Sequence, residues 1–391
     1  FFKSLAPGRA AGGKVCLILF IHDIMCSAET MNFKEKAIEL KNNIKRYKHL
    51  LIYIKGSPDP DALAASYMLK LICESFDIKA TIDSPVPPSL PQNIRLIKDI
   101  HLPVQFKSIG DDVKKYDAYA VLDHQSVFEE GITGIIPCAI HIDHHEKTAE
   151  NIPVEFEILM NDIGSTSAII ILLVKELGLQ FDEQDWKKAA TALYYGIQTD
   201  TDNFQQATPL DMEALAVIAP YTDKTILNKI NHLPFPKEAM VTLNLALQNQ
   251  VIYEEWLIAG IGYIDEKYRD NIAIIGDFLL KREDIATVVV FSIVAKEKGL
   301  TLDASFRTRD EHLNLNRLIK ELSKDGGARR YKGAFQVDLD YFVHAPDRDM
   351  LWKTVHDTTI EALKKKIDAA TTGGLGHFFR AMKRKVSSWF K

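Results

Sequence analysis

Residues 50–75, with the sequence LLIYIKGSPDPDALAASYMLKLICES, combine a short apolar run, a turn and a longer segment with apolar residues at helical spacing. The run at 50–54 predicts a buried strand, and the segment at 62–75 predicts the helix that follows it. Similar patterns predict strands at 78–83, 117–123 and 138–143 and helices at 165–177 and 186–200. Strands and helices that alternate in this way favour an α/β fold with a parallel sheet covered on both faces.

The composition limits the class of protein. The chain has 391 residues, of which 47% are apolar and 26% charged, so we expect about two soluble globular domains. The net charge of -5 gives no general attraction to nucleic acid, so a polyanion would need a local basic patch. The four cysteines form no CxxC pair, which argues against structural zinc and predicts a reducing, cytoplasmic location.

Changes in periodicity divide the chain into parts. The first natural-looking start is Met31, so the residues before it are expected to lie outside the functional domain. Strand-like runs at 256–264, 287–295 and 300–308 and a helix at 314–322 predict a second, smaller α+β domain. The expected parts are an extension at 1–30, a parallel-sheet domain at 31–225, a helical connector at 226–250, an α+β domain at 251–370 and a basic amphipathic tail at 371–391.

The tail contains GHFFRAMKRKVSSWFK at 376–391, in which every charged side chain is basic. A helix there would place most of its large apolar side chains along one side. Two interpretations stay open. The helix docks on its own domain or on a second copy of the chain in a homodimer, or it holds the protein reversibly on an anionic membrane surface as a peripheral membrane protein.

Acidic residues stand where several of the expected elements end. Asp59 and Asp61 follow the first strand, Asp123 follows a later one, and Asp200 and Asp202 stand near the end of a helix. Because ligands of a parallel sheet gather at the carboxyl ends of its strands, we expect several carboxylates to meet in one cleft. Two like charges about 4 Å apart repel by roughly 4 kcal/mol at an effective dielectric constant near 20, so the cluster needs protons or cations.

The motif IDHH at 142–145 adds two imidazoles to these acids. Carboxylates with one imidazole suit Mn²⁺ or Mg²⁺ better than they suit copper or a thiolate-rich zinc site. Two such ions that share a carboxylate would activate water and neutralise a phosphoryl oxygen. His144 is therefore a candidate metal ligand, and His145, which should face the other way, is a candidate phosphate contact.

Each of these residues also has a plain structural explanation. Aspartates at element ends commonly cap helices or close turns, and His145 could make a structural hydrogen bond. Ser165 and Thr166 are most simply the cap of the helix at 165–177. Asp202 is the weaker candidate, since an aspartate in such a loop usually bonds its own backbone.

Taken in order, four motifs resemble those of the DHH phosphoesterase family: PDPDA at 58–62, VLDH at 121–124, IDHH at 142–145 and TDTDNF at 199–204. SFRTR at 305–309 and GGARRYKGAF at 326–335 resemble the DHHA1 domain of a subgroup that includes RecJ-like exonucleases, nanoRNase/pAp phosphatases and cyclic-dinucleotide phosphodiesterases. The resemblance covers about residues 45–345. It implies an α/β protein with a parallel-sheet DHH domain, a smaller α+β DHHA1 domain and a cleft between them.

The resemblance implies a two-metal site. Asp61, Asp123, His144 and Asp200 would hold one manganese ion tightly, with magnesium as the alternative metal. Asp59 and Asp123 would hold a second ion weakly, and Asp123 would bridge the two. The second site is the weaker one because Lys55 stands where the family has a metal-binding histidine, and an ammonium group repels a cation.

The resemblance also implies roles in catalysis and substrate binding. Asp123 and His145 would be catalytic, with His145 on the scissile phosphate. Arg307, Gly326 and Gly327 would bind the distal phosphate or nucleotide of the substrate.

One departure lies in the glycine-rich loop, where Ala328 replaces the family's histidine. Arg329 and Arg330 follow at once, with Lys332 close behind, and could serve as phosphate contacts instead.

Three functions remain open at this stage. The first is a manganese-dependent phosphodiesterase or phosphatase that hydrolyses short oligonucleotides or nucleotide-sized phosphoesters. The second is a nucleotide-binding or nucleic-acid-binding regulatory protein with weakened catalysis, which Lys55 would explain. The third is a pyrophosphatase or exopolyphosphatase.

Overall fold

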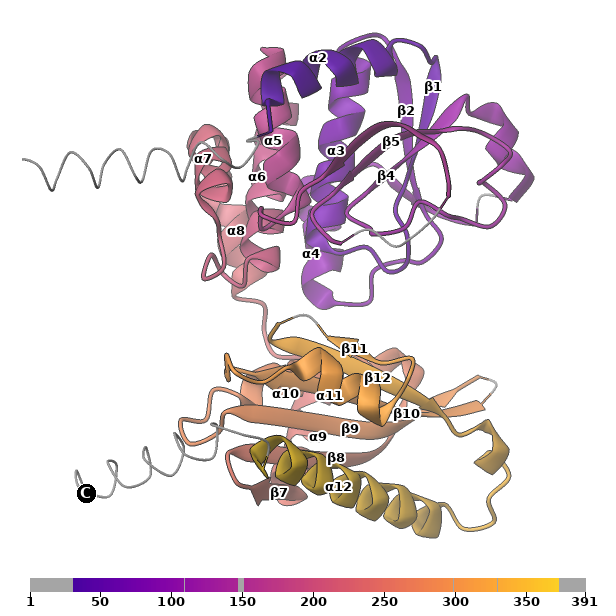
Figure 1. Ribbon diagram of the computed structural model, residues 1–391, viewed down its shortest axis with the longest axis vertical. Coiled ribbons are helices and arrows are strands. Elements are labelled where there is room, and N and C mark those ends of the chain that lie inside the picture. Colours follow the sequence, from indigo (N-terminus) through magenta and orange to yellow (C-terminus); the bar gives the residue numbers. More distant parts are fainter. Residues whose placement is uncertain (1–30, 109, 147–150, 298, 329, 373–391) are drawn as a thin grey trace, which may run out of the picture. The chain divides into compact units, whose positions relative to one another are not determined.

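The computed structural model describes residues 31–108, 110–146, 151–297, 299–328 and 330–372. The chain divides into two compact units, with the boundary between Leu233 and Pro234 (Figure 1). The extension at 1–30, Arg329 and the tail segment at 376–391, for which a helix was expected, lie outside the described residues.

The first unit contains a six-stranded sheet in which every neighbouring pair is parallel, in the order β3-β2-β1-β4-β5-β6. The strands are β1 (His49–Tyr53), β2 (Lys79–Ser84), β3 (Val104–Phe106), β4 (Ala118–Leu122), β5 (Cys138–Asp143) and β6 (Val154–Leu159). The predicted α/β class with a parallel sheet is confirmed. The strand order reverses between β1 and β4, and it is at such a point that open parallel sheets bind their ligands.

The two faces of this sheet are covered differently. Leu50 and Ile52 of β1 belong to a buried cluster that contains residues of α2, α3, α5 and α6. Leu51 and Tyr53, on the opposite face, pack under the 3₁₀ helix η1 and the connection from β4 to β5. The helical elements of the unit are α2 (Phe33–Ile44), α3 (Pro60–Glu74), α4 (Pro91–Ile100), η1 (Gly110–Lys115), α5 (Thr166–Leu177), α6 (Glu183–Asp200), α7 (Pro209–Ile218), η2 (Ala219–Tyr221) and α8 (Lys224–Asn231).

The second unit contains a mixed six-stranded sheet in the order β11-β12-β10-β9-β8-β7, in which only β8 and β9 are parallel. Helices α9 and α10 pack on one face, and α11 and α12 pack on the other. The elements are α9 (Lys237–Gln248), β7 (Gln250–Tyr253), β8 (Trp256–Asp265), η3 (Glu266–Tyr268), α10 (Asn271–Leu279), β9 (Thr287–Lys296), β10 (Gly299–Thr308), α11 (Leu315–Leu322), β11 (Gly327–Ala328), β12 (Lys332–Asp338), η4 (Asp340–Phe342) and α12 (Arg348–Thr372).

The segment at 226–250, for which a helical connector was expected, contains most of α8 and all of α9. Helix α8 belongs to the first unit and α9 to the second. Among the described helices, none combines the length and the apolar sequence that crossing a membrane requires.

Two adjacent glycines in the second unit have different surroundings. A Cβ atom on Gly326 would lie 2.6 Å from Cγ2 of Ile319 on α11 and 2.7 Å from Cβ of Phe335 on β12. The nearest atom to a Cβ on Gly327 would be Oδ1 of Asn316, at 3.8 Å. The packing of α11 on the sheet therefore requires glycine at 326, whereas a methyl group at 327 would make only an ordinary van der Waals contact.

We expect Gly326→Ala to lower the free energy of unfolding by about 1–3 kcal/mol, because the added methyl group must displace α11 or β12. Gly327→Ala is the matched control and should change it by less than about 0.5 kcal/mol. Urea unfolding of the full chain, followed by far-ultraviolet circular dichroism, measures both values. Equal effects of the two substitutions would contradict this account of the packing.

Candidate metal centre

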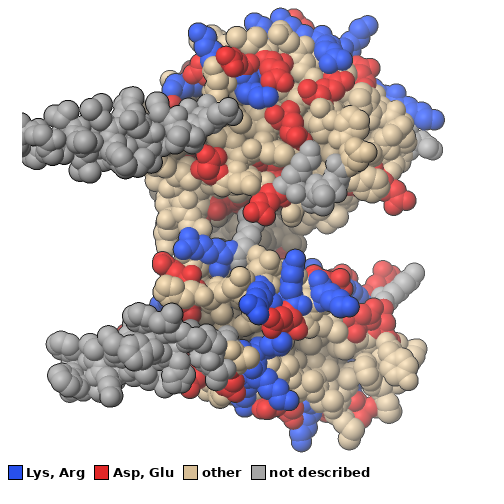
Figure 2. Space-filling view, in the orientation of Figure 1, with Lys and Arg blue, Asp and Glu red and all other residues tan. Residues whose placement is uncertain are grey.

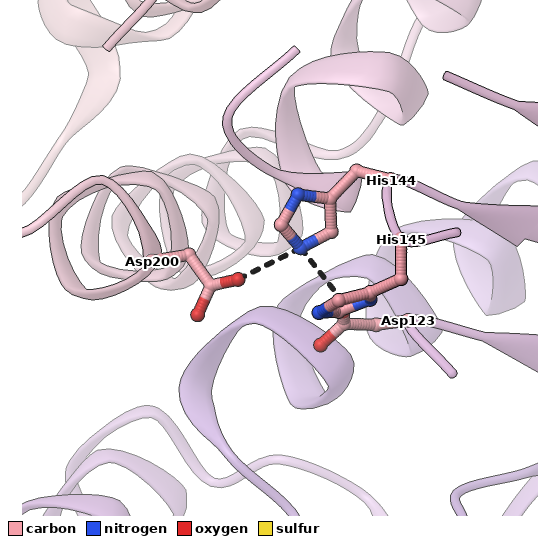
Figure 3. A group of neighbouring side chains, drawn as sticks. All are labelled: Asp123, His144, His145 and Asp200. Atoms are coloured by element: carbon pink, nitrogen blue, oxygen red, sulfur yellow. Dashed lines mark ion pairs between the residues drawn. The ribbon is translucent and has the colours of Figure 1, made fainter. Parts of the chain in front are cut away.

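Four side chains gather at the carboxyl edge of the parallel sheet: Asp123, His144, His145 and Asp200 (Figure 3). Their ligand atoms all lie within 4.8 Å of one another. Asp123 follows β4, the two histidines follow β5, and Asp200 is the last residue of α6. The fold thus brings together residues from three separate motifs at the point where the strand order reverses.

Asp123 is held in an uncommon backbone conformation. Its φ of 56° lies in the left-handed region, which costs most residues other than glycine roughly 1–2 kcal/mol and costs aspartate and asparagine less. The backbone N–H of Asp123 donates to the carbonyl of Ile142 at 3.0 Å, and the hydroxyl of Thr166 donates to its Oδ1 at 3.2 Å. Such strain persists only where neighbours fix the residue, and it is frequent at functional sites.

His144 has the surroundings of a metal ligand. Its Nε2 lies 2.9 Å from Oδ2 of Asp200 and 3.4 Å from Oδ1 of Asp123 (Figure 3). Neither contact has hydrogen-bond geometry, so this buried nitrogen has no hydrogen-bond partner. A nitrogen and carboxylate oxygens that converge without bonding one another form a donor set that fits a hard or borderline divalent cation.

The electrostatics of these groups follow from their burial and proximity. Burial, followed by the charge of Asp59, raises the pKa of Asp123 to about 7. Burial would lower the pKa of His144, but the nearby carboxylates of Asp123 and Asp200 outweigh it and raise this pKa to about 11. Without a cation, His144 is therefore an imidazolium that partly neutralises the carboxylates around it.

Two further predicted ligands bond to helix N-termini. Oδ1 of Asp59 accepts a hydrogen bond from the N–H of Ala62 at 2.9 Å and caps α3. Asp61 is fully buried, and its two oxygens accept bonds from the N–H groups of Thr166 and Ser167 at 2.7 and 2.9 Å, at the start of α5. Burial, followed by the charge of Asp123, raises the pKa of Asp61 well above its usual value. Asp61 therefore lies beside the centre, with both oxygens engaged by α5.

The orientation expected for His145 is wrong. Its ring does not face away from His144, because the two ring centroids are only 4.1 Å apart (Figure 3). The alternation of side chains along a strand stops at Asp143, the last residue of β5, and therefore does not extend to the histidines. Nδ1 of His145 lies 2.7 Å from Oδ1 of Asp143, so this aspartate sets the direction of the ring.

Asp143 is a site residue that the sequence analysis missed. Burial would raise its pKa, but the hydrogen bond with His145 and the neighbouring imidazoles outweigh burial and hold the pKa below its usual value. An ionised carboxylate can only accept hydrogen bonds, so the proton in this contact is on Nδ1 of His145. The same oxygen accepts the N–H of His144 at 2.8 Å. The sequence pattern that could have identified Asp143 is an aspartate directly before two histidines at the end of a predicted strand.

Lys55 also has contacts that the sequence could not show. Its Nζ donates to Oγ of Ser126 at 3.2 Å and to the carbonyl of Phe128, and it lies 3.8 Å from Oε2 of Glu129. The ammonium group therefore bonds to the connection that follows Asp123. Asp202 lies in the turn after α6, with a φ of 49°, outside the group of four.

The predicted substrate residues of the second unit differ in their surroundings. The guanidinium of Arg307 pairs with the carboxylate of Asp277, and its Nη1 donates to Oγ of Ser305 at 2.8 Å and to the carbonyl of Phe306. Arg330 is exposed and lines a cavity of about 340 Å³ beside the start of α11. Lysine and arginine side chains gather on the face of this unit seen in Figure 2.

Residues 49–197 match the model of the DHH family, N-terminal domain. The uncharacterized protein MJ1633 of Methanocaldococcus jannaschii is 31% identical over 338 residues, which make up 85% of this chain and 66% of that protein. The chain thus spans slightly less than two thirds of the length of this relative.

Two solved structures resemble the chain at low identity. An exopolyphosphatase-related protein from Bacteroides fragilis has a TM-score of 0.66 at 15% identity, over 86% of this chain and 96% of that one, and shows a common fold. Exonuclease RecJ bound to manganese has a TM-score of 0.44 at 12% identity, over 81% of this chain and 93% of that one. Residues 49–197 of this chain therefore carry the N-terminal domain of the DHH family.

Proposed function

We propose that the chain is a metal-dependent phosphoesterase that hydrolyses short oligonucleotides or nucleotide-sized phosphoesters. The observation that carries this proposal is the buried Nε2 of His144, which stands between the carboxylates of Asp123 and Asp200 without a hydrogen bond. The members of the DHH family are phosphoesterase hydrolases, which supports the same reaction class.

The residues assigned to the metal are Asp123, His144 and Asp200, with Asp61 beside them. The preferred ion is Mn²⁺, with Mg²⁺ as the alternative, because the donors are oxygens and one imidazole. When bound, such an ion lowers the pKa of a water molecule and neutralises charge on a phosphoryl oxygen. We assign a second, weaker ion to Asp59 and Asp123.

The chain's own residues would orient the substrate. His145 is assigned to the scissile phosphate, and Asp143 holds its ring in place through Nδ1. Thr166 holds one oxygen of Asp123 through its hydroxyl. Both contacts fix side chains before the substrate arrives, and this reduces the reorganisation that the reaction requires.

The distal part of the substrate is assigned to the second unit. Arg330 is a better candidate than Arg307 for a phosphate contact, because Arg330 is exposed at a cavity and Arg307 already bonds to Asp277. Gly327, where the backbone is open, is a better candidate than Gly326 for a close approach to an anion. Arg329 stays a candidate from the sequence.

A second candidate is the hydrolysis of pyrophosphate or short polyphosphate, which the same centre could perform. The fold shared with an exopolyphosphatase-related protein is the observation in its favour. A third candidate, a nucleotide-binding protein with weakened catalysis, rests on Lys55 in place of a metal ligand. The substrate therefore has to be determined by comparing products.

Asp123→Asn should reduce the hydrolysis of a dinucleotide in the presence of Mn²⁺ at least about 100-fold, because the substitution removes the central carboxylate and keeps its shape. Asn also tolerates the left-handed backbone at this position. Asp202→Asn is the control, with the same chemical change in a nearby turn, and should stay within about threefold of the native chain. Chromatography of the products from dinucleotide and from pyrophosphate gives both rates.

Hydrolysis of pyrophosphate alone would favour the second candidate. Tight nucleotide binding without turnover at any Mn²⁺ concentration would favour the third.

Binding of Mn²⁺ should release protons at pH 7, because the pKa of about 11 makes His144 an imidazolium in the metal-free chain. The affinity should therefore rise with pH, since protons compete with the cation for Nε2. Calorimetry in two buffers of different ionisation enthalpy measures the number of protons released. His144→Ala should lower this number by about one and weaken binding, whereas the control His312→Ala should change neither. A binding enthalpy that is the same in both buffers would contradict the assignment of His144.

A further inference from the structure

The connection that follows Asp123 is fixed to the sheet along its length. We call residues 124–129 the 124–129 loop. The hydroxyl of Tyr119 donates to the carbonyl of Val127 at 3.0 Å, and the side chain of Val127 is buried under the sheet. Nε2 of His141 on β5 lies 2.9 Å from the carbonyl of His124. Strands β4 and β5 therefore both hold the loop.

Strand β1 holds the same loop from its other side. Tyr53, its last residue, donates its hydroxyl to Oε1 of Glu129 at 2.9 Å. Lys55, two residues later, donates to Oγ of Ser126 and to the carbonyl of Phe128. Because Glu129 lies 3.8 Å from the Lys55 ammonium, the charge of Lys55 is compensated within the loop. Lys55 is thus a positioning residue for the backbone at Phe128.

Phe128 is the exposed apolar residue of this loop. Its side chain is 52% exposed, whereas that of Val127 is 1% exposed. A large aromatic ring held in water on a fixed loop has no role in the core, and such rings are frequent where proteins bind ligands. The fixed backbone also means that the ring would lose little conformational freedom when a ligand stacks on it.

The 124–129 loop is close to the metal centre. It begins at the residue after Asp123, at the carboxyl edge of the sheet. His124, the first residue of the loop, directly follows Asp123, which is assigned to the metal, and its carbonyl is held by His141 on β5, the strand that ends at Asp143.

We propose that Phe128 stacks on a nucleobase of the nucleotide that carries the scissile phosphate, so that the substrate must have a base next to the bond that breaks. This inference rests on the proposed function and deepens it. Stacking needs no hydrogen-bond pattern because every base has a flat π-face, so the ring of Phe128 would accept any base. Inorganic polyphosphate, which has no base, would gain nothing from Phe128.

The test compares substrates with and without a base in variants at this position. Phe128→Ala should lower kcat/KM for a dinucleotide by about 5- to 150-fold, the range measured for stacking on one base, mainly through KM. Phe128→Trp keeps a ring and should stay close to the native value. Ile135→Ala is the matched control, because Ile135 is 51% exposed on the same connection and lies outside the loop.

Dinucleotides with an abasic sugar at the 5′ or the 3′ position complete the experiment. The native chain should hydrolyse one of the two abasic dinucleotides about as slowly as Phe128→Ala hydrolyses the dinucleotide with both bases. Phe128→Ala should hydrolyse that abasic dinucleotide at the same rate as the native chain. If Phe128→Ala slows the base-bearing and both abasic substrates equally, the loop has only a structural role and the inference is wrong. If it slows none of them, the inference is also wrong, and the proposed function stands.

Binding without turnover separates this inference from the proposed function. The affinity for adenosine 5′-monophosphate, measured by calorimetry, should fall by a similar factor in Phe128→Ala, and the affinity for inorganic phosphate should not. If the chain hydrolyses no dinucleotide but Phe128→Ala weakens the binding of adenosine 5′-monophosphate alone, the proposed function fails and the stacking of Phe128 on a base stands. If adenosine 5′-monophosphate binds no better than inorganic phosphate to the native chain, the proposed stacking on Phe128 is refuted.

Discussion

The site depends on the repulsion among buried carboxylates. Asp61, Asp123 and Asp200 approach one another around His144 where water cannot screen their charges. The metal-free chain meets this repulsion with the proton on His144 and with the N-terminus of α5, whose N–H groups bond to Asp61. The proton on His144 and the N-terminus of α5 offset only part of the repulsion, because the pKa values of Asp61 and Asp123 remain raised. A divalent cation carries two positive charges, against the one that the proton gives to His144, and would offset more of this repulsion.

The positions of these residues follow from the strand order. Parallel strands end at one edge, and the reversal between β1 and β4 separates the connections that leave the sheet there. The turn after β1 carries Lys55 and Asp59, and the turns after β4 and β5 carry Asp123 and His144. Short loops after buried strands fix the backbone well, so the donor atoms are positioned by the core itself.

The sequence predicted the parts of the fold that local pattern controls. Apolar runs located β1, β4 and β5 because buried parallel strands are apolar throughout. Ser165 or Thr166 was expected to cap the helix at 165–177; Ser165 is the cap and accepts the N–H of Ala168, whereas Thr166 is the first residue of α5. Contacts between distant residues could not be predicted. The bonds from Asp61 to α5 span 105 and 106 positions, and the pair of Arg307 with Asp277 joins β10 to α10. The direction of His145 was wrong because the end of β5 cannot be read from sequence to one residue.

The contact of Asp61 with α5 ties the metal centre to the folding of the first unit. Asp61 stands in the first turn of α3, and the N–H groups that it binds exist as a pair only when α5 is formed and packed against α3. An unfolded chain would scatter the donors over more than 140 positions, from Asp59 to Asp200, and would bind a cation far more weakly. By thermodynamic linkage, a cation that binds only the assembled site stabilises the unit by RT ln(1 + [M]/Kd). The concentration of the metal would thus set the fraction of the first unit that is folded.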